Sequence, residues 1–187
     1  MHLLFCYNLI GVIIVRIGID IDDTICNTKV LQIDCWKEYF NNNKCERFTE
    51  ELPSNINSFG DPYIDLFWDT YRETFFSPEL KENVVEVINR LQSKGVECFI
   101  ITSRITEKYD NLVGRLDEWL SSNGIKMNDF YTGIKDKAGF LVENNIDILI
   151  DDDIRHFNSV LELGKICIHF NEDMTWLKVE EIINKYL

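Results

Sequence analysis

The sequence predicts an α/β fold, a doubly wound parallel sheet with helices on both faces. Three observations support this prediction. Short apolar segments rich in β-branched residues alternate with longer amphipathic segments along most of the chain. Alternation of this kind is typical of parallel βαβ units. Polar and acidic residues directly follow several of the apolar segments, at the strand ends where open α/β sheets bind their ligands.

The first expected strand covers residues 15–21, where an apolar β-branched residue stands at every second position. A helix is expected over residues 27–43, where apolar side chains recur at helical spacing. A second helix is expected over residues 61–75, because an Asp-Pro pair opens it. A third is expected over residues 77–94, because a Ser-Pro pair opens it and a glycine follows it.

The second half of the chain alternates more regularly between the two patterns. The expected strands are residues 96–101, a short segment near residue 130, residues 146–150 and residues 165–170. The expected helices are residues 106–123, residues 136–144, a short helix after residue 153 and a last helix from residue 175.

One interval is too long for this alternation. Asp20 and Thr102 end the first two strands and lie 82 residues apart, whereas a single crossover needs only about 30 residues. We therefore expect residues 26–76 to form a small helical cap, inserted after the first strand and lying over the ligand-binding edge. Residues 15–25 and 77–187 are then the α/β core.

Residues 1–14 are expected to be an N-terminal extension, with Val15 as the native start. The segment is apolar, but it has no basic residues at its beginning and no small-residue cleavage site, so it does not match a signal peptide. It is also shorter than the roughly 20 residues of a membrane span.

Composition narrows the classes of function. The formal net charge is -13, which opposes general binding to nucleic acid but leaves room for one small phosphorylated ligand in a pocket. The six cysteines form no C-x-x-C pair, which favours reduced thiols in a cytoplasmic protein. We expect no membrane association and a monomer or homodimer.

Three polar pairs follow apolar strands and therefore meet at one edge of the expected sheet. The pairs are Asp20 with Asp22, Thr102 with Ser103, and Asp151 with Asp152. Crowded carboxylates repel one another unless a cation lies among them, and oxygen ligands of this kind suit Mg²⁺. The sequence therefore predicts a magnesium and phosphate site.

These segments resemble the four motifs of the haloacid dehalogenase-like (HAD) hydrolases. The run IGIDIDDT resembles the first motif, FIITSR the second, Lys137 the third and LIDDD the fourth. The resemblance extends over residues 15–170. The strand endings and the all-helical insertion are similar to the 5'(3')-deoxyribonucleotidase group and its bacterial members. The resemblance implies a Rossmann-like core and a Mg²⁺-dependent phosphomonoester hydrolase, a nucleotidase for (deoxy)nucleoside monophosphates.

The resemblance also implies roles for the acidic residues. Asp20 would attack phosphorus and form an aspartyl-phosphate. Asp22 would act as general acid and base, and its backbone carbonyl would bind the metal together with the Asp20 carboxylate. Asp152 would be the inner-sphere metal ligand and Asp151 a water-mediated one, or the two roles would be reversed.

Three further residues would hold the phosphoryl oxygens, Thr102, Ser103 and Lys137. Lys135 is an alternative to Lys137. The spacing of 14 residues between Lys137 and Asp151, and the helix that follows it, favour Lys137.

Substrate contacts are less specified by the sequence. We expect Phe59, Phe67 and Trp68 of the aromatic-rich cap to stack on a nucleobase, since base stacking is worth about 1–3 kcal/mol. Arg104 is expected to contact phosphate or to form a salt bridge at a helix edge. His156 is expected to have a surface or capping role.

Two other functions fit the same residues. One is a phosphatase for another small phosphate, such as a sugar phosphate. The other is a binding module that keeps the fold and has lost the reaction, for which loss of Asp20 or Asp22 would be the expected mark; both are present.

Overall fold

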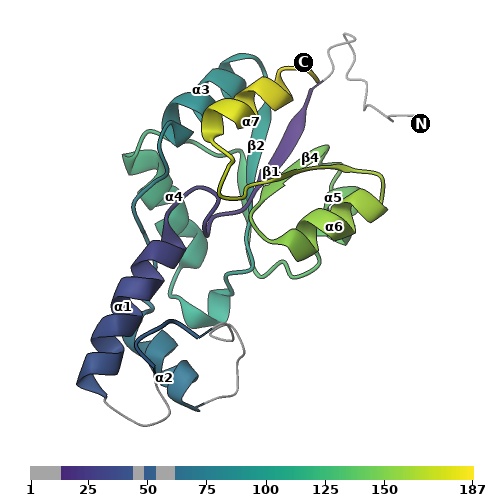
Figure 1. Ribbon diagram of the computed structural model, residues 1–187. Coiled ribbons are helices and arrows are strands. Elements are labelled where there is room, and N and C mark those ends of the chain that lie inside the picture. The colour runs from purple at the N-terminus through teal and green to yellow at the C-terminus, as the bar shows by residue number, and fades with distance from the viewer. Residues whose placement is uncertain (1–13, 44–48, 54–61) are drawn as a thin grey trace. The chain divides into compact units, whose positions relative to one another are not determined.

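The computed structural model describes residues 14–43, 49–53 and 62–187 (Figure 1). The chain divides into two compact units. The core unit joins the residues up to Ile25 with Lys81–Leu187, and the cap unit is Cys26–Leu80. Within the described residues, no helix has the length and apolar character needed to cross a bilayer. Nearly all of the expected N-terminal extension lies outside these residues.

The core unit is built on a five-stranded parallel sheet, which confirms the predicted fold class. Its strands are β1 (Arg16–Ile19), β2 (Glu97–Ile101), β3 (Asp129–Tyr131), β4 (Ile148–Asp151) and β5 (Ile166–His169). The order across the sheet is β3-β2-β1-β4-β5. The chain thus builds outward from β1 on one side and then returns to build on the other. The neighbouring carboxyl ends of β1 and β4 form the switch point where such sheets bind ligands.

Helices cover both faces of this sheet. They are α3 (Val84–Ser93), α4 (Leu112–Ser122), α5 (Lys137–Glu143), α6 (Ile154–Glu162) and α7 (Trp176–Ile183). Helices α3 and α7 pack together, and so do α5 and α6 (Figure 1). The buried side chains beneath α5 and α6 form one apolar cluster, made of Ile101, Ala138, Leu141, Ile146, Leu149 and Val160.

Gly18 in the middle of β1 is explained by this packing. A Cβ atom at position 18 would overlap the side chain of Ile101 and touch that of Leu149. Because β1 is the central strand, a side chain there would push the neighbouring strands' residues out of the core. Glycine lets the apolar cluster close over β1.

Two helices begin later than their sequence signals predict. Helix α3 begins at Val84, where the preceding Asn83 is left-handed with φ 61°. Helix α4 begins at Leu112 after a left-handed Asn111 with φ 48°, and a separate 3-10 turn, η1 (Thr106–Lys108), precedes it. Asparagine adopts this conformation more easily than most residues, so it can reset the chain direction just before a helix.

The cap unit contains α1 (Thr28–Asn42) and α2 (Pro62–Tyr71). Leu80 pairs with Cys26 in an isolated antiparallel bridge, so the two ends of the unit meet. Most of its aromatic rings pack against one another in a single buried cluster. The buried members are Cys35, Trp36, Tyr39, Ile64, Phe67, Tyr71 and Phe75.

Candidate active site

The site lies at the carboxyl edge of the sheet, where β1, β2 and β4 end. Asp20 directly follows β1, and its N–H donates to the carbonyl of Ile150 in β4 at 3.0 Å. Thr102 directly follows β2, and its N–H donates to the carbonyl of Tyr131 in β3 at 2.9 Å. Asp151 is the last residue of β4. Strand pairing therefore holds all three polar residues at one edge, as the sequence predicts.

The turn after Asp20 is fixed by its own hydrogen bonds. Asp23 is left-handed with φ 56°, and the N–H of Thr24 donates to the carbonyl of Ile21 at 3.3 Å. The indole Nε1 of the buried Trp176 donates to the carbonyl of Thr24 at 3.1 Å. These contacts hold the loop that carries the acidic pair of the first motif.

Lys137, the first residue of α5, links two of the strand ends. Its Nζ donates to Asp20 Oδ1 at 2.5 Å and to Asp151 Oδ2 at 2.6 Å, and its side chain is 1% exposed. Burial disfavours the charged amine, but the two carboxylates outweigh it and raise the pKa of Lys137 to about 12. Lys135 is exposed. Of the two lysines considered from the sequence, the structure therefore brings Lys137 to Asp20 and leaves Lys135 at the surface.

Negative charge still exceeds positive charge at this edge. Burial, opposed by Lys137 and assisted by neighbouring carboxylates, raises the pKa of Asp20 to about 6. Burial and the charges of Asp20, Asp151 and Asp23 raise the pKa of Asp152 to about 8. Both carboxyl groups are therefore in surroundings that a cation would stabilise.

Asp151 has its carboxylate fully engaged by protein donors. Oδ2 accepts from Lys137 Nζ and lies 3.1 Å from His156 Nδ1, while Oδ1 accepts from the N–H of Asp153 at 2.8 Å. Burial alone would raise its pKa, but these hydrogen bonds and charges lower it below the usual value. Both oxygens of the Asp151 carboxylate thus accept hydrogen bonds from groups of the protein itself.

Arg104 pairs with Asp22 through both of its acceptor oxygens. Nη2 lies 2.7 Å from Oδ1, and Nε lies 3.0 Å from Oδ2. Of the two roles considered for Arg104 from the sequence, the structure shows a salt bridge, and its partner is the proposed general acid.

The second motif places one hydroxyl in the site and the other at the surface. Thr102 is buried, and its Oγ1 accepts from the N–H of Arg104 at 3.2 Å. Ser103 is exposed, and its Oγ donates to the carbonyl of Ile134 at 3.1 Å. Only Thr102 therefore has a side chain directed into this network.

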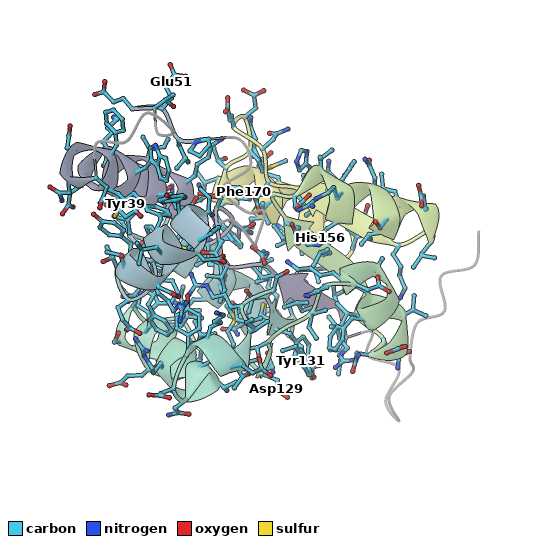
Figure 2. All side chains as sticks on the ribbon, turned by 90° about the horizontal axis from the view of Figure 1, so that it is seen from below. Tyr39, Glu51, Asp129, Tyr131, His156 and Phe170 are labelled. Carbon is cyan, nitrogen blue, oxygen red and sulfur yellow. The ribbon has the colours of Figure 1, made fainter. Side chains whose placement is uncertain are left out.

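His156 corrects the expectation of a surface or capping role. It lies in the first turn of α6 (Figure 2), and its side chain is 19% exposed. Its Nδ1 lies 3.1 Å from Oδ2 of Asp151. His169, which the sequence did not single out, has its Nε2 2.9 Å from the carbonyl of Asp152. The position of His156 in a helix that starts directly after the acidic strand end was the signal available in the sequence.

The cap aromatics expected to contact substrate have different positions. The Phe67 side chain is 0% exposed and packs edge to face with Trp36 and Tyr39, so its ring has no surface left for a ligand. Trp68 is half-buried at the margin of the same cluster. Phe59 lies outside the described residues.

The donor set bears on the expected metal. In residues 14–43, 49–53 and 62–187, no three side chains of His, Cys, Asp or Glu form a group that could hold a metal ion. Mg²⁺ commonly retains several waters and needs only one or two protein carboxylates together with a substrate phosphate. Asp20 and Asp152, with raised pKa values among other acids, fit that smaller requirement.

Comparison with known proteins gives a family and a set of similar structures. The family model of haloacid dehalogenase-like hydrolases matches residues 17–119, more than half of the chain. No curated protein matches the sequence.

Three solved structures illustrate the similarity of fold. A predicted phosphatase from Clostridium acetobutylicum is 13% identical, with a TM-score of 0.65, over 92% of this chain and 99% of that one. A mutant of CbbY from Rhodobacter sphaeroides, in complex with xylulose-(1,5)-bisphosphate, is 13% identical, with a TM-score of 0.56, over 88% and 91%. YfnB from Bacillus subtilis, bound to magnesium, is 12% identical, with a TM-score of 0.59, over 91% and 99%.

Proposed function

The chain belongs to the haloacid dehalogenase-like hydrolase family, and from this premise we propose that it is a phosphatase that hydrolyses small phosphomonoesters through an aspartyl-phosphate at Asp20. The observation that carries the proposal is the contact between Asp20 and Lys137. A buried carboxylate at the switch point of the sheet lies 2.5 Å from a buried ammonium group. That arrangement presents an oxygen nucleophile beside a fixed positive charge.

In the first step, a carboxylate oxygen of Asp20 forms a bond to phosphorus as the bond from phosphorus to the ester oxygen breaks. Lys137 keeps the Asp20 carboxylate oriented and places positive charge where the phosphoryl oxygens arrive. The Thr102 hydroxyl, whose oxygen accepts from the N–H of Arg104 at 3.2 Å, has its own O–H to donate to a phosphoryl oxygen on the neighbouring side.

Asp22 moves the protons. It donates one to the departing ester oxygen and later accepts one from the water that attacks the aspartyl-phosphate. That attack breaks the bond between Asp20 and phosphorus and releases phosphate. Because Arg104 binds both Asp22 oxygens, Asp22 has to leave Arg104 at least in part before it can act.

We propose Mg²⁺ as the cofactor, held by the Asp20 and Asp152 carboxylates and the backbone carbonyl of Asp22. When bound, it supplies positive charge that offsets the repulsion between Asp20 and the substrate phosphate. The raised pKa of Asp152, due to burial and neighbouring carboxylates, supports its choice. Asp151 is occupied by Lys137, His156 and a backbone N–H, which favours Asp152 as the inner-sphere ligand.

For the substrate, we propose a (deoxy)nucleoside monophosphate, which makes the protein a nucleotidase. We propose that Trp68, which is half-buried, stacks its indole face on the base. Phe67 cannot stack on a base in this arrangement, since its ring is buried. A sugar phosphate is the second candidate, favoured by the similarity in fold to CbbY, which was solved with xylulose-(1,5)-bisphosphate.

A cytoplasmic location is also part of the proposal. The cysteines at positions 26, 35, 98 and 167 are free thiols, as is common in a reducing compartment.

The test is a panel of phosphomonoesters assayed with and without Mg²⁺. The panel contains p-nitrophenyl phosphate, nucleoside monophosphates and sugar phosphates. Asp20→Asn is expected to abolish turnover of all of them, because the amide is nearly isosteric and cannot attack phosphorus. The exposed Asp117 provides the matched control, and Asp117→Asn is expected to react normally. Turnover by Asp20→Asn near the wild-type rate would overturn the proposal, and faster turnover of sugar phosphates than of every nucleotide would overturn the nucleotidase assignment.

A further inference from the structure

Asp151 is the residue on which the position of Lys137 depends. Lys137 Nζ is shared between the Asp20 and Asp151 carboxylates at 2.5 and 2.6 Å. A small rotation of the Asp151 carboxylate would therefore move the ammonium group toward or away from Asp20. Rotation about this bond is intrinsically broad for aspartate, so other contacts have to fix it.

Two donors fix the Asp151 carboxylate besides Lys137. The N–H of Asp153 binds Oδ1 at 2.8 Å, and His156 Nδ1 lies 3.1 Å from Oδ2. An ionised carboxylate can only accept hydrogen bonds, so Nδ1 of His156 is the donor. His156 thus binds the same oxygen that Lys137 binds.

Helix α6 presents His156 at this point for a local reason. Asp153 is the N-cap of α6, and its side chain accepts from the N–H of Arg155 at 2.8 Å. The helix therefore starts directly at the acidic strand end. A side chain in the first turn of a helix leans back toward the N-terminus, which brings the His156 ring to Asp151.

We propose that His156 is a positioning residue for the phosphatase reaction, acting through Asp151 to hold Lys137 against Asp20. The inference rests on the proposed function and extends it to a residue that does not touch the reacting atoms. Without His156, the Asp151 carboxylate keeps the Asp153 N–H on Oδ1 and Lys137 on Oδ2, but it loses the one side-chain donor that holds Oδ2 independently of Lys137. The ammonium group then follows Asp151, and the charge opposite the transferring phosphoryl group is misplaced.

Three variants separate this role from general stabilisation. His156→Leu removes the donor and keeps an apolar side chain. His156→Asn restores an N–H donor near the place of Nδ1. Asn158→Ala changes an exposed residue of the same helix and serves as the matched control.

With p-nitrophenyl phosphate, His156→Leu is expected to lower kcat by about 10- to 100-fold, the usual effect of losing a partner of a site residue. KM is expected to stay close to wild type, because substrate binding does not depend on this one orientation. His156→Asn is expected to retain most of the wild-type kcat, and Asn158→Ala is expected to retain all of it. Unchanged kcat in His156→Leu, a loss confined to KM, or equal losses in the Leu and Asn variants would overturn the inference.

A second measurement tests whether His156 positions Lys137, and it does not depend on turnover. Lysine labelled with ¹⁵N at Nζ gives a resonance for Lys137 that is assigned by its loss in Lys137→Arg. The resonance is expected to shift in His156→Leu and to return in His156→Asn. If the wild type hydrolyses no phosphomonoester, the proposed function fails. Whatever the turnover, a Lys137 resonance that does not move in His156→Leu overturns the positioning role.

Discussion

Arg104 and Asp22 form a bidentate pair, with Nη2 2.7 Å from Oδ1 and Nε 3.0 Å from Oδ2. The Arg104 side chain is only 7% exposed, whereas that of Asp22 is 38% exposed. A guanidinium fork on a carboxylate is geometrically specific. The residue proposed to move protons is therefore held in one orientation by Arg104, the last residue of the second motif.

The interaction between Arg104 and Asp22 should be measurable as a coupling free energy of unfolding. In a double-mutant cycle of Arg104→Gln and Asp22→Asn, we expect a favourable coupling of about 1 kcal/mol, because the Asp22 side is open to solvent screening. Urea unfolding of the wild type, the two single variants and the double variant measures it. Additive effects within error would show that the two side chains do not stabilise each other in solution.

Lys137 is expected to be essential for stability as well as for turnover. Lys137→Met leaves Asp20 and Asp151 as buried carboxylates without their shared cation, a loss that typically costs about 3–5 kcal/mol. Urea unfolding at neutral pH tests this. The matched control is Lys135→Met, two residues away and exposed, for which less than about 0.5 kcal/mol is expected. Equal effects of the two variants would contradict the buried ion pair.

Removing and restoring the metal should show which acid of the fourth motif, Asp151 or Asp152, is the metal ligand. Chelation is expected to stop hydrolysis, and Mg²⁺ is expected to restore it better than the larger and more loosely coordinated Ca²⁺. Mg²⁺ should also raise Tm by mass action, and Asp152→Ala should lose most of that shift. An Asp152→Ala protein with undiminished Mg²⁺ affinity would move the ligand assignment to Asp151.

The pair between α3 and α7 gives a prediction for pH. A hydrogen bond from Arg90 lowers the pKa of Glu180 below its ordinary value, with Nη2 2.6 Å from Oε2. A group with a lowered folded-state pKa binds fewer protons when folded, so its contribution to stability is present above pH 4.5 and is lost on acidification. Glu180→Gln should therefore destabilise the protein slightly at pH 7, with the difference disappearing toward pH 3. Urea unfolding at the two pH values measures this, and a difference that does not depend on pH would contradict it.

The sheet and its polar edge could be predicted because the responsible signals are local. Apolar β-branched runs identify strands, and Asp20, Thr102 and Asp151 follow such runs directly. The family model match confirms the resemblance to haloacid dehalogenase-like hydrolases. The predicted start of α3 was wrong because proline at a first helical position is only a preference. Leu80, inside the predicted helix, pairs with Cys26 instead.

Side-chain partners were harder to foresee because they depend on tertiary packing. Helical spacing cannot distinguish a ring that enters a core from one that lines a pocket, and Phe67 enters the core. His156 looked like a residue on a helix surface, because its contact with Asp151 depends on how α6 follows β4. Arg104 had two reasonable partners, and only the packed loops select Asp22.

We propose that Asp20 carries the phosphoryl group during turnover, and this can be measured directly. Rapid quenching during hydrolysis of p-nitrophenyl phosphate, followed by borohydride reduction, converts an aspartyl-phosphate into homoserine, which peptide mass spectrometry locates. Homoserine is expected at position 20 in the wild type, and none is expected there in Asp20→Asn. Homoserine at another aspartate, or hydrolysis with aspartate 20 intact at every quench time, would contradict it.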